Sequence, residues 1–474
     1  MNEGKSSEAG EIYDEVRKAD VPKQKKLEAI RGAILARKAG GIPLLVEQLR
    51  SQDKAFLNIG VATARELSGR EVGEALAGEL SKTAPERAAL LLRALADRNE
   101  RPIPAAVLIA AKSGPRPVRI AAIDLIGRLG DARSLSTLLD IAGESDDELS
   151  QAAKGALVAL PGQEVNSEIA AQLAKAEGST LPVLIAVVGQ RRIEATRDLV
   201  KRLDNPNAAV RRAALAALGE TIGPRQLGVL IAQVVAPKNR ADGEAAQKAL
   251  LAASVRMPDR EACAAELAAA LPRASAATKV KLLEILGAVG GTKALETIAT
   301  AVKGSDEDLQ DAGSRMLGQW MSVDAGPTLL DLAKNASSDK LQSRAMRGYI
   351  RLARQFAKSS GQRAEMCELA LATTNRPAEK KLVLAVLQGY PSVETLRVAV
   401  EASRSAELKQ DASRVAMAIA QKLGGNSPEV QKLLADAGVE PLKIEIVKAE
   451  YGAGSTQKDV TDALKQHLQG LPLI

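Results

Sequence analysis

Histidine is the commonest general acid–base residue in enzymes, and this chain contains one, His467. The sequence around it has no nucleophile-elbow motif, so a Ser-His-Asp or Cys-His site would lack its usual setting. We therefore interpret His467 as an exposed polar residue near the C-terminus. The sequence predicts no catalytic residue, and we expect the chain not to be an enzyme.

Metal ligands and nucleotide-binding loops are equally sparse. Cys263 and Cys367 stand alone in separate helical patterns and are expected to be small buried residues, because the chain has no C-x-x-C and no H-E-x-x-H spacing. The glycines at 290–291 and 452–454 lack the full phosphate-loop patterns and are interpreted as turns. Acidic runs at 144–148 and 306–308 are explained better by helix caps than by cation sites. The sequence thus predicts no metal and no cofactor.

Basic residues give one positive signal. Between residues 191 and 240 the acidic residues are few, and the basic ones are Arg191, Arg192, Arg197, Lys201, Arg202, Arg211, Arg212, Arg225, Lys238 and Arg240. If several lie on one face, they could contact duplex phosphates, and the candidate contacts are Arg191, Arg192, Arg211 and Arg212. The alternative, which we favour, is a solvated and partly self-paired face. The net charge of +7 permits an anionic partner without requiring one.

The composition indicates that closely packed helices position these basic residues. Hydrophobic residues make up 46% of the chain but aromatic residues only 1%, so the apolar content is largely Ala, Leu, Val and Ile. Such side chains suit thin layers of closely packed helices and are, for Ala and Leu, strong helix formers. The single Trp, Trp320, is expected in the core.

The chain repeats itself. Val118–Gly127 and Val210–Gly219 share the pattern V-R-x-A-A-aliphatic-x-x-aliphatic-G. Weaker copies begin, at intervals of roughly 30 to 35 residues that are typical of solenoids, near Lys25, Phe56, Pro85, Leu149, Leu181, Glu244, Lys279, Leu309, Leu341, Glu379 and Leu408. An amphipathic segment such as 135–142 or 295–302 precedes each copy, so each repeat is predicted to be a helix pair. The alanine pair should let neighbouring helices approach closely.

Helix ends are also visible in the sequence. Ser145 with Glu148 is predicted to form a capping box, and the segment from Ser305 is similar. Pro85 and Pro428 are expected in first helical turns. Glycines are expected to stop helices at Gly127, Gly130, Gly219, Gly223, Gly290 and Gly291.

Residues 118–130 and 210–223 resemble HEAT-like repeats, including the short type of phycobilisome-lyase proteins. This resemblance implies an all-α, right-handed α-α superhelix of the HEAT/ARM type, with about 13 helix pairs over residues 21–440. Residues 1–20 would be an N-terminal extension or cap. In this family a basic residue at Arg119 or Arg211 pairs with an acidic residue near the repeat boundary. Other repeats carry Ser150, Gln310 and Gln342 there, so the predicted charge ladder is broken.

Residues 441–474 change character. An alternating stretch at 442–451 predicts a strand, and 459–468 predicts a helix. This tail resembles the opening of a β-rich module that follows HEAT-like stretches in exported multidomain bacterial proteins. We expect residues 442–474 either to dock on the last repeat or to belong to a truncated domain.

Three hypotheses for function follow. The leading one is a non-catalytic scaffold that binds an unidentified protein, by analogy with other solenoids. The second is duplex nucleic-acid binding through the basic residues of 191–240. The third is an accessory region of a larger exported, carbohydrate-related bacterial enzyme. No apolar run is long enough to span a membrane. We expect a monomer, cytoplasmic as the sequence stands, or periplasmic if the chain is a fragment without its signal peptide.

Overall fold

The computed structural model describes residues 6–424 and 427–436, and all regular structure in these residues is helical. The chain divides into two compact units, Met1–Arg256 and Met257–Ile474. The predicted tail, residues 441–474 with His467, lies outside the described residues.

Unit 1 is a series of helices. Its α-helices are α1 (Ser6–Lys18), α2 (Lys23–Arg37), α3 (Ile42–Arg50), α4 (Lys54–Glu66), α5 (Arg70–Gly78), α6 (Pro85–Arg98), α7 (Ala105–Ser113), α8 (Arg116–Leu129), α9 (Leu135–Ala142), α10 (Asp147–Ala159), α11 (Gln163–Lys175), α12 (Thr180–Arg191), α13 (Thr196–Arg202), α14 (Ala208–Thr221), α15 (Leu227–Val235) and α16 (Arg240–Arg256). Short 3₁₀ turns join several of them: η1 (Lys38–Gly41), η2 (Leu80–Lys82), η3 (Ala132–Ser134) and η4 (Pro224–Gln226).

Unit 2 continues the same pattern. Its α-helices are α17 (Arg260–Ala270), α18 (Ala276–Val289), α19 (Thr292–Lys303), α20 (Glu307–Gly318), α21 (Gly326–Asn335), α22 (Asp339–Gln355), α23 (Ser360–Thr373), α24 (Pro377–Gly389), α25 (Val393–Ser403), α26 (Lys409–Lys422) and α27 (Pro428–Asp436). Two 3₁₀ turns, η5 (Leu271–Arg273) and η6 (Val323–Ala325), precede α18 and α21.

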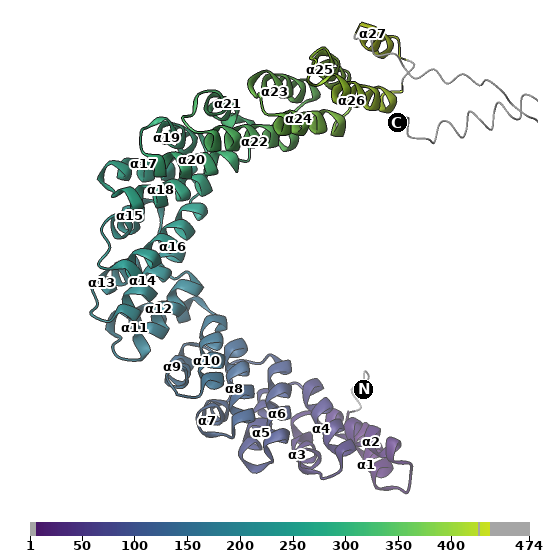
Figure 1. Cartoon of the computed structure of the whole chain (residues 1–474). Coiled ribbons are helices and arrows are strands. Elements are labelled where there is room, and N and C mark those ends of the chain that lie inside the picture. The colour runs from purple at the N-terminus through teal and green to yellow at the C-terminus, as the bar shows by residue number, and fades with distance from the viewer. Residues whose placement is uncertain (1–5, 425–426, 437–474) are drawn as a thin grey trace, which may run out of the picture. The chain divides into compact units, whose positions relative to one another are not determined.

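Helices pack in sequential pairs within each unit. Each odd-numbered helix contacts the even-numbered helix that follows it, and consecutive even-numbered helices contact one another. Figure 1 shows the two resulting layers, odd and even, in each unit. Every predicted repeat start falls at or inside an even-numbered helix, from α2 to α26. The all-α architecture of about 13 helix pairs is therefore confirmed for the described residues.

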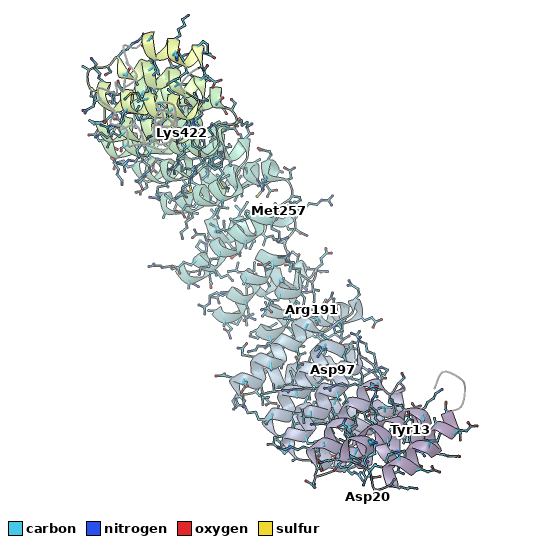
Figure 2. All side chains as sticks on the ribbon, turned by 90° about the vertical axis from the view of Figure 1, so that its right-hand side faces the viewer. Tyr13, Asp20, Asp97, Arg191, Met257 and Lys422 are labelled. Atoms are coloured by element: carbon cyan, nitrogen blue, oxygen red, sulfur yellow. The ribbon has the colours of Figure 1, made fainter. Side chains whose placement is uncertain are left out.

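The core is aliphatic, as the composition predicts. Leu91, Ile126 and Leu218 are completely buried between the layers. Trp320 and both cysteines are buried too, which confirms the positions expected for them. At one end of unit 1, the ring of Tyr13 in α1 lies on Gly32 of α2, so a small residue in α2 makes room for one of the few aromatic rings (Figure 2).

Two of the predicted helix-stop glycines lie inside helices instead. Gly127 is in α8 and Gly219 in α14. A Cβ atom on Gly127 would lie 2.9 Å from the Cα of Ala156 in α10, and one on Gly219 would lie 2.9 Å from the Cα of Ala249 in α16. The prediction that these two glycines end helices was wrong. They allow neighbouring helices to pack closely, which is the role predicted from the sequence for the alanine pair. Gly290, by contrast, ends α18 with a φ of 71°.

The predicted caps were one residue out of place. The N-cap of α10 is Asp146, whose carboxylate accepts from the backbone N–H groups of Glu148 and Leu149. Asp306 caps α20 in the same way, accepting from Leu309. Each helix begins one residue later than Ser145 or Ser305 would require, so the side chain that reaches the free N–H groups is the aspartate.

Candidate functional site

Arg191 closes the end of a neighbouring helix. Its guanidinium group donates to the carbonyl oxygens of Leu157 (3.1 Å) and Val158 (2.7 Å) in the last turn of α10 and of Leu160 (2.7 Å) just after it. It also donates to Asn166 Oδ1. Burial lowers the pKa of Arg191. Arg191 is labelled in Figure 2, and its guanidinium group is held by these backbone carbonyls.

Arg211 is also directed inward. Its Nε lies 2.8 Å from Asp242 Oδ2, both side chains are mostly buried, and Nη1 donates to the carbonyls of Asn205 and Pro206. Arg119 pairs similarly with Glu144 at 2.6 Å. In both repeats the arginine reaches an acidic residue beyond its own helix, as the resemblance to HEAT-like repeats implies.

Arg192 and Arg212 lie at the surface. Arg192 is 3.3 Å from Glu220 Oε2, and Arg212 donates to the carbonyl of Ala208 in its own helix. The four candidate residues therefore split into two interior and two exposed arginines. Phosphate binding by this face stays a prediction.

Where the charge ladder breaks, a hydrogen-bond ladder continues. The second residue of the V-R-x-A-A pattern donates to a carbonyl at or just past the end of the preceding odd-numbered helix. The donor–acceptor pairs are Arg119 to Ala111 (2.8 Å), Ser150 to Ala142 (2.7 Å), Gln310 to Gly304 (2.7 Å) and Gln342 to Ala336 (2.9 Å). In these four repeats the position holds a side-chain donor, whether or not it is charged.

A second set of arginines, which the sequence analysis missed, joins consecutive even-numbered helices. Like Arg191, these arginines come from late in one even helix and donate to carbonyls at or near the end of the previous one. Their acceptors are Ala64, Leu67 and Gly69 for Arg98, Gly219 and Ile222 for Arg256, and Gly318 and Trp320 for Arg351. A cation at a helix C-terminus is favourable, because the carbonyls there lack intrahelical partners.

The most cationic helix of unit 2 is α22. Its basic residues recur with spacings of four and three: Lys340, Arg344, Arg347, Arg351 and Arg354. Such spacing places side chains on one helix face, and the opposite face, including Ala345, Tyr349 and Leu352, is buried. We call these five residues the α22 stripe.

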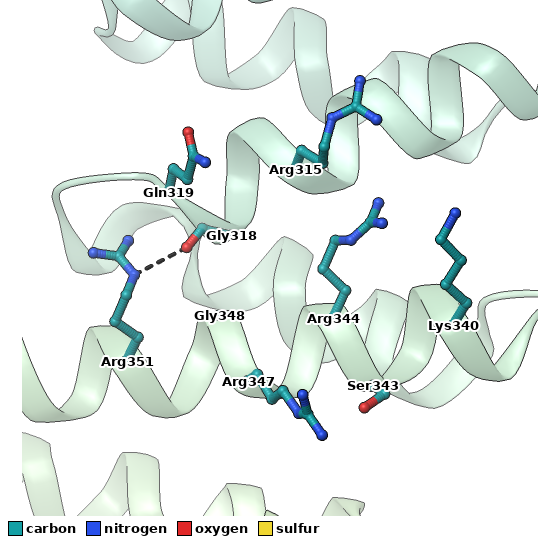
Figure 3. Close-up of a pocket in the computed structure, with 9 residues that line it drawn as sticks. All are labelled: Arg315, Gly318, Gln319, Lys340, Ser343, Arg344, Arg347, Gly348 and Arg351. Atoms are coloured by element: carbon teal, nitrogen blue, oxygen red, sulfur yellow. Dashed lines mark hydrogen bonds between the residues drawn. The ribbon is translucent and has the colours of Figure 1, made fainter.

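The α22 stripe borders a groove of about 580 Å³ between α20 and α22. Its described lining residues, none acidic, are Arg315, Gly318, Gln319, Lys340, Ser343, Arg344, Arg347, Gly348 and Arg351 (Figure 3). The two glycines allow the helices to touch, since a Cβ on Gly348 would lie 2.9 Å from the Cα of Gly318. A Cβ on Gly318 would meet nothing within 4 Å, so it would point into open space.

One carboxylate compensates part of the charge. Asp311 in α20 lies 2.9 Å from Lys340 and 3.0 Å from Arg344, and it also pairs with Arg315. The hydrogen bond from Lys340, followed by that from Arg344, lowers the pKa of Asp311, so it is ionised at neutral pH. Arg347 is exposed and, within the described part of the chain, forms no ion pair or hydrogen bond.

The groove was not predicted from the sequence, because its basic residues are spaced along α22 and do not form a dense cluster like that of residues 191–240. The signal that could have found it is the spacing of the stripe together with its single acidic neighbour in α22, Asp339. The glycine contact at Gly318 and Gly348 has no comparable signal, since the two residues lie in different repeats.

Among the described residues, no three or more His, Cys, Asp or Glu side chains gather where they could hold a metal ion. No helix among them has the length and apolar character that crossing a membrane requires.

Paired helices stacked in series are the architecture of HEAT-type repeat proteins, and this chain has that all-α fold. No protein-family model and no curated protein sequence matches it. Solved karyopherin structures do. The chain shares 14% identity with Kap121p bound to the SUMO protease Ulp1p, at a TM-score of 0.43, over 91% of this chain and 55% of that one.

Two other solved structures match to a similar degree. Kap121p bound to Nup53p shares 13% identity at a TM-score of 0.45, over 91% of this chain and 55% of that chain. A structure that describes Kap95p binding to RanGDP shares 12% identity at a TM-score of 0.40, over 91% of this chain and 62% of that chain. The chain thus spans little more than half the length of the Kap121p chains that it matches.

Proposed function

We propose that this chain is a non-catalytic scaffold that binds a protein partner through the groove between α20 and α22. The observation that carries the proposal is the exposed Arg347, which forms no ion pair or hydrogen bond with any described residue and is one of five cationic side chains that line the groove. Arginine is enriched among the residues that contribute most to protein interfaces. Its planar guanidinium group presents several N–H donors and can bind a carboxylate through two hydrogen bonds.

The groove supports binding better than bond-making chemistry. Its side chains are four arginines, a lysine, a glutamine and a serine, so it offers donors but no group that could act as a base near neutral pH. Kap121p is seen bound to Ulp1p and to Nup53p, but at these TM-scores that likeness identifies no partner for this chain.

Site-specific crosslinking tests the proposal. A photo-reactive amino acid in place of Ser343, which lines the groove, is expected to capture a defined protein in an extract of cells that produce this chain. The captured protein is then purified and its binding measured with the unmodified chain. Binding should weaken by about 10-fold in Arg347→Glu, because a favourable charge becomes an unfavourable one.

The matched control is Arg225→Glu, which changes the net charge identically at an exposed arginine of unit 1. Equal weakening by both substitutions would show general charge attraction and not a groove. Unchanged binding in Arg347→Glu would remove the groove from the proposal.

Duplex nucleic-acid binding is a second candidate, motivated by the exposed positions of Arg192 and Arg212. It predicts an affinity that falls steeply with salt and is lost when both are changed to Glu. An affinity that both substitutions leave unchanged would exclude this face. The third candidate, an accessory region of an exported enzyme, rests on residues 441–474 and stays a prediction.

A further inference from the structure

We infer that the groove receives an extended acidic segment of the partner, and that Asp311 acts as an internal competitor for the same cations. This inference rests on the proposed function and adds the chemistry of the segment that is bound. Three observations support it: the length of the α22 stripe, the acidic residues on the neighbouring even helices, and the contacts of Asp311.

The length of the α22 stripe suits a short extended peptide. Lys340 and Arg354 are fourteen residues apart in one helix, which corresponds to about 21 Å at ~1.5 Å per residue. An extended chain advances ~3.3 Å per residue, so about six residues would run the length of the stripe. Alternate side chains of such a segment point to the same side, where carboxylates could reach several cations at once.

Acidic side chains compensate some of the cations on both sides of the groove. On α24, Lys380 and Lys381 pair with Glu407 (2.5 Å) and Asp411 (3.8 Å). On α18, Glu284 lies 4.0 Å from Arg315. A nucleic-acid duplex would gain from phosphate contacts spread over several repeats, and a single strand from aromatic rings on which its bases stack. The cations of this groove lie on α20 and α22, and none of its described lining residues is aromatic. Both features favour a short acidic polypeptide.

Asp311 holds the place that a partner carboxylate would take. It contacts three cations, Arg315, Lys340 and Arg344, of which Lys340 and Arg315 are well exposed and able to turn toward an incoming group. Each of these contacts must be shared or broken when an acidic segment binds. Asp311→Asn replaces the carboxylate by an uncharged amide of the same shape. The partner segment should then bind more tightly, because its carboxylates are no longer repelled by the negative charge of Asp311.

The experiment measures binding of the full chain to a fluorescein-labelled peptide of eight residues rich in Asp and Glu, at low and moderate salt. Asp311→Asn is expected to tighten binding about 3-fold and Arg347→Glu to weaken it about 10-fold, the range typical of exposed charge pairs. Arg225→Glu, far from the groove in sequence, should change it little. A peptide with Gln and Asn in place of the acids is the negative control.

A second variant separates the groove from charge alone. Gly318→Leu adds a side chain where a Cβ meets open space, and it should weaken peptide binding without altering net charge. Circular dichroism melts of all variants check that each remains folded.

Several outcomes would overturn the inference. The first is that folded Asp311→Asn binds the acidic peptide no more tightly than the unsubstituted chain does. The second is that the Gln and Asn peptide binds as tightly as the acidic one. The third is that an oligonucleotide of equal charge binds more tightly than the acidic peptide. If crosslinking at Ser343 still captures a protein that needs Arg347, the proposed scaffold function survives while the acidic-segment inference fails.

Discussion

Donor side chains at helix ends determine how one repeat is joined to the next. The last carbonyls of a helix have no partner within it, and here arginine, serine or glutamine side chains from other helices supply the missing donors. This explains why the pattern tolerates a change from Arg211 to Gln310 at equivalent positions. In these repeats the shared property of the position is a hydrogen-bond donor that reaches the carbonyl, and its charge varies.

Gln310 allows the donor requirement to be tested. Gln310→Leu removes the donor to Gly304 and is expected to lower the free energy of unfolding by about 1 kcal/mol. Gln310→Arg keeps a donor and should change stability by less than ~0.5 kcal/mol. Urea denaturation of the two variants measures the difference. Equal loss in both would mean that the amide itself, and not donation, is needed.

Arg191 and Arg192 are adjacent but have different environments, so they form a matched pair. Arg191→Met leaves three carbonyls and Asn166 without their donor, and a loss of about 3 kcal/mol is expected. Arg192→Met removes one exposed ion pair to Glu220, so a loss below ~0.5 kcal/mol is expected. Denaturant midpoints of the two variants compare them directly, and similar values would contradict the interior role of Arg191.

At the scale of the element, contact between even-numbered helices depends on small residues placed where the axes cross. Gly127, Gly189 and Gly219 each meet an alanine of the next even helix, Ala156, Ala217 and Ala249. Glycine inside a helix lowers its stability, and close packing compensates for Gly219 in the last turn of α14.

Gly219→Ala tests that compensation. Its new Cβ would lie 2.9 Å from Ala249 Cα and 3.0 Å from its carbonyl oxygen, so backbone must move, and a loss of about 2 kcal/mol is expected. Gly228→Ala in α15 meets no atom within 4 Å and should gain up to ~1 kcal/mol from helix propensity. Thermal or urea unfolding measures both. Stabilisation by Gly219→Ala would contradict the close contact.

Helix α1 is attached to α2 partly by charge, which makes the attachment depend on pH. Hydrogen bonds from Arg17 and then Arg37 lower the pKa of Asp14 from 3.8 to about 2. Because the folded state binds the proton more weakly than the unfolded state, this stability is present above about pH 4 and is lost as pH falls toward 2.

Asp14→Asn should therefore cost about 1 kcal/mol at pH 7, a modest value because water screens the partly exposed pairs. The difference from the unsubstituted chain should shrink below about pH 4 and vanish near pH 2. Hydrogen exchange of α1 amides, measured between pH 3 and pH 7 and corrected for intrinsic rates, follows it. A difference that does not change with pH would assign the effect to packing.

At the scale of the whole molecule, each helix pair contacts chiefly its neighbours in the chain, in both units. Stability in such arrays is close to a sum of repeat and interface terms, so damage should stay local. Gly219→Ala is expected to speed hydrogen exchange in α12, α14 and α16, while α2 and α4 of the same unit remain protected. Mass spectrometry of exchanged peptides measures this, and uniform loss across unit 1 would indicate one cooperative block.

Much of the fold could be predicted from sequence alone, because helix pairs are built from local patterns. The spacing of aliphatic residues, together with weaker copies of the V-R-x-A-A pattern at intervals of roughly 30 to 35 residues, predicts paired helices and their order. The burial of Cys263, Cys367 and Trp320 was also predicted from the sequence. The spacing of the cations of α22 is also visible in the sequence, although the α22 stripe was not among the predicted contact residues.

Only tertiary structure decided which charged residues are available to a partner. Arg191 and Arg192 have the same chemistry and adjacent positions, yet one donates to carbonyls of another repeat and the other lies in solvent. The groove beside Arg347 exists because Gly318 and Gly348, thirty residues apart, meet at one crossing of α20 and α22. Local sequence determines helices because their hydrogen bonds are local, whereas burial of a charge depends on which residues of other repeats surround it.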